Sequence, residues 1–486
     1  MINIFRKVFA GLCLLFLFLS ASAQPDSVDV FINQQMLRRK IPGLQLAIIK
    51  DGKIIKKGNY GLANVQDSIP VTDKTVFSIN SITKAFTGVA ILQLMEGGKL
   101  QLSAPISTYL GNLPRAWMNV TVQQLLSHTS GIPDMVDEEE SLLIAATVEG
   151  AWEKVISSPM IFSPGEAFRY NQTNYLLLGK IIDTLSGMPF TEFIINGQLE
   201  KAGMTKTIRS GFGASKNIVP HSAGAYRYSR GTLVNMFFSF PPSLQTAAGM
   251  SSTAEEIALW LIQLQAGNLF KNPTSLRKLW QPALLNNGKT AGFNNLLNGY
   301  AAGWPVITRA DHPAMAPVGG GRSALFVYPN DGLSIVVLTN LAGGAPDVFI
   351  DELAGLFIPD MKEVNGFGLS PNLKLLRSEL EKNGYGSAEK VARQMQKKSK
   401  AEFSEKELNN WAYKLIKQGK AEQALEIFKL NVALFPQSSN AFDSLGEMYV
   451  SREQYSLAIK NYEMALKLNP ANENAREMLK KLQQGN

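Results

Sequence analysis

Two pairs of strand-like segments that lie far apart in the chain constrain its fold more than any other feature. Residues 44–49 and 53–57 flank one short turn, and residues 323–328 and 333–338 flank another. Each pair is typical of a β-hairpin. The sequence between them, particularly residues 100–290, combines helical patterns with loops rich in Gly, Pro and Asn. Hairpins at both ends of a domain with a helical middle predict an α+β fold, in which the two ends close one antiparallel sheet.

The segments around the first hairpin have helical and loop patterns. Residues 27–40 predict an amphipathic helix, whereas residues 58–75 are typical of a loop. From residue 81 to residue 96 apolar side chains recur at helical spacing, and a Gly-Gly pair follows them. A long apolar helix that begins at Ser81 is therefore expected.

The C-terminal part of the chain repeats itself, because residues 405–438 and 439–472 align at a 34-residue period. This period and its residue pattern resemble the tetratricopeptide repeat, a helix-turn-helix unit. Two isolated repeats are marginally stable, so the module is expected to pack on a neighbour or to dimerise. The matching residues of the second copy are Phe442, Leu445, Gly446, Tyr449, Ala458, Tyr462, Ala465 and Pro470. Those of the first copy are Leu408, Trp411, Ala412, Leu415, Ala424, Phe428 and Pro436, with Asn431 in place of the expected alanine.

The first 23 residues have the pattern of an export signal. Arg6 and Lys7 precede an apolar run over residues 8–19, and small residues at 21–23 precede Gln24. The run is too short to span a bilayer comfortably. Cleavage is therefore expected to leave no stable membrane anchor and to place the mature chain in the periplasm or outside the cell.

The remaining domain boundaries follow from a change of composition near residue 358. Residues 24–358 form the expected first domain, residues 359–404 a charged helical linker, and residues 405–486 the repeats. Within the linker, residues 372–399 contain a further helical pair, so a degenerate third repeat remains an alternative.

Charge and composition exclude several classes of protein. The chain has 48 basic and 40 acidic residues, and loss of Arg6 and Lys7 leaves 46 against 40, a net charge of +6. This excess is diffuse, which argues against a nucleic-acid partner. Cys13, the only cysteine, lies in the expected signal, and the chain has three histidines. Neither a G-x-S-x-G nor an H-E-x-x-H motif occurs, so we expect no metal site and no cofactor.

Ser81 and Lys84 form a candidate nucleophile–base pair. Their spacing places a hydroxyl and an amine on one face of a helix, whose N-terminal dipole favours negative charge on the serine oxygen. A desolvated lysine can take the serine proton. Residues 275–278 and 387–390 also match S-x-x-K, so spacing alone is a weak signal. The position of Ser81, at the start of a long apolar helix after the first hairpin, distinguishes it from the other two.

Five ordered segments resemble the serine β-lactamase and penicillin-binding protein family, especially its class C and esterase branch. Together they cover roughly residues 30–358, and the occurrence of five motifs in the family's order makes the resemblance specific. The resemblance implies a β-lactamase/transpeptidase-like fold and a serine hydrolase that forms an acyl-enzyme on Ser81. The segments are residues 77–86, 120–133, 164–179, 246–253 and 338–340.

Carried over residue by residue, the resemblance implies that Tyr170 is the general base. A phenol with an ordinary pKa of about 10 is a poor base at neutral pH, so nearby Lys84 must favour the phenolate or relay the proton. The family pattern is Tyr-x-Asn, and here Gln172 takes the place of the asparagine, which implies altered substrate positioning. The strict match at residues 328–330 is interpreted as a turn between strands.

The third motif of the family is expected just before the strand at residues 323–328. Pro317 occupies the position of its usual lysine or histidine and supplies neither a side-chain proton nor a backbone donor. His312 and Arg322 are the candidates for the missing cation. Gly319 and Gly320 follow Pro317 and are expected to let the substrate backbone approach. The amide groups of Ser81 and Gly320 are the expected oxyanion hole.

Other polar residues of the hydrolase domain are given structural roles at this point. His128 lies in a block that is interpreted as structural, with substrate contact as its minor alternative. Asp134 and the acidic run 137–140 are interpreted as solvated loop charges. The sequence at residues 289–291 is interpreted as surface despite its similarity to a Lys-Thr-Gly motif.

Three functions remain open from the sequence. The first is hydrolysis of a small-molecule ester, amide or peptide, and the weakened third motif favours an esterase or peptidase over an efficient β-lactamase. The second is a D-Ala-D-Ala carboxypeptidase of the penicillin-binding protein type. The third is a catalytically weak ligand-binding protein whose repeats recruit a protein partner.

Overall fold

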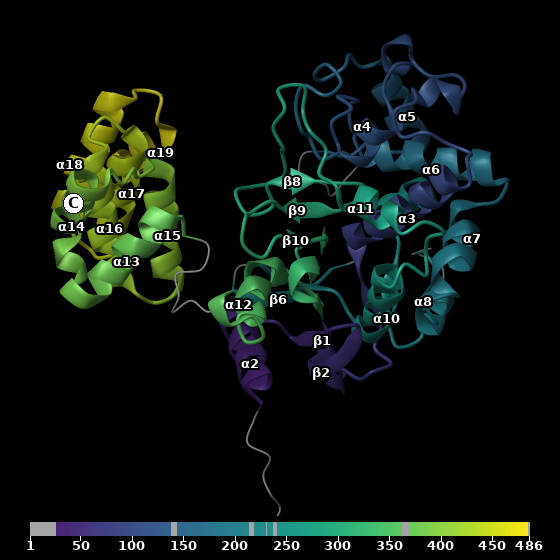
Figure 1. Ribbon diagram of the computed structural model, residues 1–486, viewed down its shortest axis with the longest axis horizontal. Helices are drawn as coiled ribbons and strands as arrows, with labels where there is room; N and C mark the ends of the chain where they lie inside the picture. Colours follow the sequence, from purple (N-terminus) through teal and green to yellow (C-terminus); the bar gives the residue numbers. More distant parts are fainter. Residues whose placement is uncertain are drawn as a thin grey trace, which may run out of the picture. The chain divides into compact units, whose positions relative to one another are not determined.

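The computed structural model describes residues 26–137, 143–212, 218–229, 231–236, 241–361 and 369–484, and the expected signal sequence lies outside these ranges. The chain divides into two compact units, Met1–Phe357 and Ile358–Asn486 (Figure 1). Across the part of the chain that the structure describes, every helix is too short or too polar to cross a membrane.

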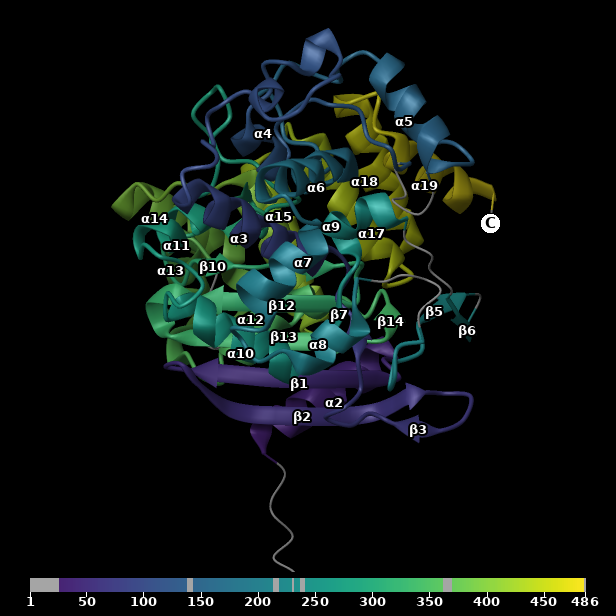
Figure 2. The same cartoon turned by 90° about the vertical axis from the view of Figure 1, so that its right-hand side faces the viewer.

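A nine-stranded sheet organises the first unit, and it joins the two ends of that unit. Its strands follow the order β3-β2-β1-β13-β12-β10-β9-β8, with β11 paired to β12. Strand β1 (Gly43–Lys50) pairs antiparallel with β13 (Leu333–Thr339), so that Leu44 lies opposite Thr339 (Figure 2). This pairing confirms the α+β fold. The other strands are β2 (Lys53–Asn64), β3 (Ile69–Pro70), β8 (Gly299–Tyr300), β9 (Pro305–Ile307), β10 (Ala314–Met315), β11 (Val318–Gly319) and β12 (Ser323–Tyr328).

Both faces of the central strands are buried because successive side chains alternate between two layers of helices. Ala47 and Val336 belong to the same core cluster as residues of α10 (Ala254–Gln265), which contacts β1 and β13. Leu46 and Val337 point to the opposite face and are also buried. Helices α2 (Ser27–Arg39) and α12 (Ile350–Ala354) lie on that side of the sheet (Figure 1).

The second strand is longer than the sequence pattern indicates. Residues 58–75 are expected to form a loop, but β2 continues to Asn64, and Gly61 lies opposite Gly43 of β1. The polar, glycine-containing stretch forms a strand because the backbone groups along that side of β1 require hydrogen-bond partners. Tertiary pairing therefore overrides the local pattern.

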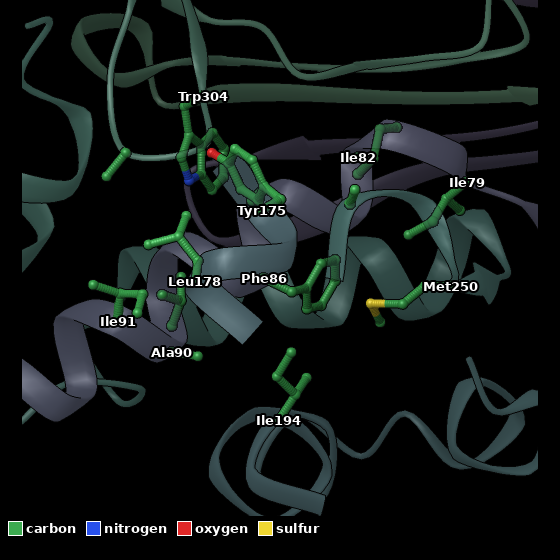
Figure 3. Close-up of a cluster of buried hydrophobic side chains, with 14 of the residues drawn as sticks. Ile79, Ile82, Phe86, Ala90, Ile91, Tyr175, Leu178, Ile194, Met250 and Trp304 are labelled. Atoms are coloured by element: carbon green, nitrogen blue, oxygen red, sulfur yellow. The ribbon is translucent and has the colours of Figure 1, made fainter. Parts of the chain in front are cut away.

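Helix α3 (Thr83–Glu96) runs through the core of the helical part of this unit. It follows a 3₁₀ turn over Asn80–Ile82, and its residues are buried almost all round. Phe86 stacks on Trp260 with ring centroids 3.9 Å apart. Figure 3 shows Phe86 and neighbouring α3 residues packed among Tyr175, Met250 and Trp304. A helix that is buried almost all round packs against neighbours on every side, so the core holds its N-terminal end in place.

Shorter elements complete the first unit. The helices are α4 (Val122–Leu126), α5 (Val148–Ser157), α6 (Gln172–Ser186), α7 (Phe190–Ile194), α8 (Thr205–Ser210), α9 (Gln245–Ala248) and α11 (Thr274–Trp280). Strands β4 (Phe77–Ser78) and β7 (Ser251–Ser252) pair with each other, and β14 (Leu341–Ala342), β5 (Tyr226–Ser229) and β6 (Thr232–Asn235) form a three-stranded sheet.

The second unit is entirely helical in its described residues, consistent with a helical repeat module. Consecutive helices contact each other in pairs along the chain. Residues 359–404, expected as a linker, contribute α13 and α14, whose Leu376 and Val391 share one core with Trp411 and Phe428. The helices are α13 (Pro371–Asn383), α14 (Ala388–Ser399), α15 (Glu405–Lys417), α16 (Ala421–Leu434), α17 (Ser439–Val450), α18 (Tyr455–Leu468) and α19 (Glu473–Gln484).

Asn431 is an unfavourable residue inside this helical core. Its side chain is 1% exposed, and neither its amide nitrogen nor its amide oxygen has a hydrogen-bond partner among the described residues. Ala465, at the same position of the next 34-residue repeat, is fully buried and apolar. A buried amide without partners destabilises the folded state.

We predict that Asn431→Ala raises the free energy of unfolding of the second unit by about 1–2 kcal/mol, because it removes this unpaired amide and favours the helix. Hydrogen exchange of the α16 amide groups in the full chain measures the change. The reciprocal substitution Ala465→Asn is the control and should weaken protection of α18. Weaker protection of α16 in Asn431→Ala would contradict the explanation.

Candidate active site

Ser81 lies in the 3₁₀ turn that leads into α3, and Lys84 follows on the first turn of that helix. Ser81 is partly exposed, whereas the Lys84 side chain is 0% exposed. The Lys84 Nζ donates a hydrogen bond to Ser81 Oγ over 3.4 Å. The spacing seen in the sequence therefore becomes a contact between an accessible hydroxyl and a buried amine.

Lys84 is held by groups from three other parts of the unit. Its Nζ donates to Gln172 Oε1 at 2.8 Å and to the carbonyl oxygen of Ala247 at 3.0 Å. The same nitrogen lies 4.6 Å from the ring centre of Tyr170 and 5.1 Å from that of Tyr175. The structure thus brings Ser81, Lys84, Tyr170 and Gln172 together, and their individual roles remain predictions.

A strained residue precedes the candidate nucleophile. Asn80 has φ of 49°, a left-handed conformation that is uncommon for a residue other than glycine. Its side-chain Oδ1 accepts hydrogen bonds from Arg322 Nη2 at 2.9 Å and from Ser78 Oγ at 3.2 Å. Its carbonyl oxygen accepts one from Thr83 Oγ1 at 2.6 Å. These contacts hold the sharp turn that presents Ser81 at the start of α3.

The glycines predicted to bind substrate lie against this turn. A Cβ atom at Gly319 would stand 2.1 Å from the carbonyl oxygen of Ile79, so no larger residue fits there. Gly320 has φ of 54°, and a Cβ atom at this position would lie 3.1 Å from Asn80 Cγ. The end of β11 therefore approaches the backbone just before Ser81, where only glycine permits such contact.

The two residues considered for the missing cation lie in different places. His312 Nδ1 is 2.8 Å from Asp331 Oδ1, in the turn between β12 and β13, at the end of β12 remote from Gly319. His312 is therefore wrong as a candidate for the site. Arg322 lies beside Asn80, and burial lowers the pKa of its guanidinium group to about 10.

Asp134 is not a solvated loop charge, which corrects the prediction from sequence. Its carboxylate accepts backbone N–H groups of Gln172 at 3.0 Å and Thr173 at 3.2 Å, and so caps the N-terminus of α6. Burial raises the pKa of Asp134, and these backbone hydrogen bonds oppose that shift. Local sequence patterns do not reveal this cap, because it joins residues 38 positions apart. Residues 138–140 of the acidic run lie outside the described residues.

The competing sequence motifs have ordinary structural surroundings. Ser275 Oγ donates to Glu96 at 2.5 Å, and Ser387 Oγ donates to a backbone carbonyl group of its own turn. The lysine of each of these two S-x-x-K motifs is exposed. Tyr328 Oη donates to Asp351, and Lys289 is exposed. Within the described ranges, no group of three or more His, Cys, Asp or Glu side chains is arranged to hold a metal ion.

Aromatic side chains surround Tyr170, and most of them gave no signal in the sequence. The Tyr170 ring lies 4.4 Å from that of His128 and 4.9 Å from that of Phe293. Tyr300 and Phe168 complete the cluster, with ring centroids 5.6 Å apart. Phe293 is 39% exposed, so the cluster reaches the surface. Phe293 and Tyr300 come from a loop and a strand far along the chain, which only folding places beside Tyr170.

Removal of the Gln172 acceptor should impair turnover. We predict that Gln172→Leu lowers kcat for p-nitrophenyl acetate by roughly 10- to 100-fold, because the buried Lys84 amine loses its 2.8 Å hydrogen bond to Oε1 of Gln172. Steady-state kinetics of the purified full chain provide the measurement. Gln265→Leu, which removes a partly buried amide bonded to Ser334, is the control and should retain wild-type kcat. An unchanged kcat in Gln172→Leu would show that this contact is dispensable.

Comparisons with known proteins identify the family of this chain. A family model described as Beta-lactamase matches residues 28–358. Protein flp of Staphylococcus aureus (strain MRSA252) is 30% identical over 328 residues, which cover 65% of this chain and 63% of that protein, so the chain spans less than two thirds of its relative. The penicillin-binding protein from Bacillus halodurans superposes with a TM-score of 0.56 at 28% identity, covering 67% of this chain and 100% of that structure. The octameric penicillin-binding protein homologue from Pyrococcus abyssi gives a TM-score of 0.58 at 27% identity, with 68% and 76% covered.

Proposed function

This chain belongs to the beta-lactamase family of serine hydrolases and penicillin-binding proteins, and from that premise we propose that its first unit hydrolyses esters or amides through an acyl-enzyme on Ser81. The contact between Lys84 Nζ and Ser81 Oγ carries the proposal. It puts a buried amine within reach of an accessible hydroxyl, the arrangement that activates a serine without a histidine. The ring of Tyr170, 4.6 Å from the same amine, supplies a second group able to carry the proton.

The proposed reaction proceeds in two balanced steps. Ser81 Oγ attacks the carbonyl carbon while its proton passes to the Lys84–Tyr170 pair. The bond to the leaving alcohol or amine then breaks, and the leaving group takes that proton. Water attacks the resulting serine ester, gives its proton to the same pair, and releases the acid as Ser81 recovers its hydrogen. Amide groups of Ser81 and Gly320 would stabilise the oxyanion in both steps.

Ester substrates without a free carboxylate suit this site better than a D-Ala-D-Ala terminus. The residue before β11 is Pro317, which carries no charge. Arg322, the cation considered as a replacement, is 5% exposed and donates to Asn80. A peptide carboxylate would lack the cation that the family motif normally supplies, so a carboxypeptidase is the second candidate.

We also propose a cellular setting and a partner. The expected export signal would place the mature chain in the periplasm or outside the cell. The helical unit would bind a protein segment, as helical repeat modules commonly use extended surfaces for recognition. Both proposals rest on the sequence pattern and the helical architecture of the second unit.

Covalent labelling tests the nucleophile directly. A fluorophosphonate probe should add one probe mass to the full chain, and Ser81→Ala should abolish both the adduct and p-nitrophenyl acetate turnover, because the attacking oxygen is gone. Intact mass spectrometry followed by peptide mapping reads out the position. Ser275→Ala, which alters another S-x-x-K serine, is the matched control and should label like the wild type. An adduct that persists in Ser81→Ala would place the nucleophile elsewhere, and a wild-type chain that never labels would favour the ligand-binding function.

Phe293 packs against the ring of Tyr170, which is proposed to return the proton to the leaving group. Phe293 is therefore expected to contact the leaving group. We predict that Phe293→Ala raises KM for p-nitrophenyl acetate by roughly 2- to 10-fold, the value of one aromatic contact. KM for ethyl acetate, whose leaving group is small, should change less. Leu284→Ala, which shortens another exposed apolar side chain, is the control. Equal changes of KM for both esters would argue against this assignment.

A further inference from the structure

His128 holds the backbone on both sides of Tyr170. The N–H group of Arg169 donates to the His128 carbonyl oxygen at 3.0 Å. The N–H group of Asn171 donates to His128 Nδ1 at 3.1 Å. One residue thus receives the peptide N–H groups immediately before and immediately after the candidate base.

The hydrogen bonds of the imidazole define its tautomer. Two donors point at Nδ1, the Asn171 backbone and the Asn174 amide nitrogen at 3.4 Å, so Nδ1 carries no proton. Nε2 therefore holds the proton of the neutral ring and donates it to Tyr300 Oη, 3.2 Å away. Burial, and after it the charge of Lys84, lower the pKa of His128 well below its usual range. Both effects keep the ring neutral, as this pattern requires.

The His128 ring also packs against the side chain of Tyr170. The His128 ring lies 4.4 Å from the Tyr170 ring and 4.7 Å from the Tyr300 ring. His128 is 0% exposed, so it lies behind Tyr170 and not in the space open to a substrate. Its φ of 58° lies in the left-handed region, which orients its carbonyl oxygen and its side chain towards the same loop.

We propose that His128, as a neutral Nε2–H tautomer, is a positioning residue that fixes the backbone and the ring of Tyr170 relative to Lys84. This proposal rests on the proposed function, because Tyr170 must move the proton for its position to matter. His128 neither accepts the Ser81 proton nor touches substrate. Asp134 holds the backbone that follows Asn171, because its carboxylate accepts hydrogen bonds from the N–H groups of Gln172 and Thr173.

The consequence should be a loss of turnover with little loss of substrate binding. A misplaced proton-transfer group slows the chemical step, and a displacement of about 1 Å can cost roughly 100-fold. Apolar substrate contacts such as that expected for Phe293 would remain. The role therefore predicts a fall in kcat at nearly constant KM, with kcat expressed per folded molecule, because a smaller folded fraction alone would also lower the apparent kcat at constant KM.

Two substitutions at residue 128 distinguish the effect of losing the imidazole from the effect of backbone strain, because glycine and asparagine both tolerate a positive φ. His128→Gly removes the ring and its Nδ1 acceptor, and His128→Asn places an amide oxygen near the position of Nδ1. With p-nitrophenyl acetate, His128→Gly should lose kcat by roughly 30- to 100-fold at a KM within about 3-fold of wild type. His128→Asn should recover at least about 5-fold of that loss, since the N–H group of Asn171 regains its acceptor.

Further variants keep the test decisive if His128→Gly does not fold. Tyr300→Phe retains the ring but removes the oxygen that binds Nε2–H, and it should lower kcat by roughly 3- to 10-fold. Tyr328→Phe is the remote control: it also removes one buried hydroxyl, bonded to Asp351, and should lower the melting temperature with an unchanged kcat. Circular dichroism establishes which variants are folded.

Each outcome bears on a different statement. Wild-type kcat in folded His128→Gly, or His128→Asn no faster than His128→Gly, would overturn the positioning role. If His128→Gly is unfolded, wild-type kcat in folded Tyr300→Phe would overturn it. Failure of the wild-type chain to label at Ser81 would instead overturn the proposed function on which this inference rests.

Discussion

The antiparallel pairing of β1 with β13 is the interaction on which the rest of the first unit depends. It joins segments near the two ends of this unit, with Leu44 opposite Thr339, and so closes the sheet around the helical part. Because β12 follows β13 in the sheet and β11 pairs with β12, this closure carries Gly319 to the backbone of Ile79. The candidate oxyanion hole exists only when both ends of the unit are in place.

A buried amine is the second constraint, and the neighbouring segments are arranged around it. Lys84 is removed from water, which is unfavourable for an ionisable group unless it gains partners. Ser81, Gln172 and Ala247 supply these partners from three segments of the chain. The hydrogen bonds that hold Lys84 are thus also those that gather the reacting groups, so stability and chemistry depend on the same contacts.

Local patterns predicted those parts of the structure that local forces dominate. The strands at 44–49, 323–328 and 333–338 and the helix after Ser81 agree with the sequence because their apolar runs are long and their turns are marked. The extension of β2 to Asn64 and the cap formed by Asp134 did not follow from sequence. Both depend on partners supplied by distant segments, to which neither periodicity nor spacing is sensitive.

The sequence by itself determined the architecture of an α+β domain followed by helices, and it placed Ser81 and Lys84 on one helical face, because helical geometry alone puts residues three apart side by side. It also placed Tyr170 and Gln172 in the site through resemblance. Only the tertiary structure decided that His128 binds both N–H groups beside Tyr170, that Phe293 packs on its ring, and that Arg322 joins Asn80. These contacts join residues dozens to hundreds of positions apart, and their formation is governed by chain closure and packing, which no local pattern encodes.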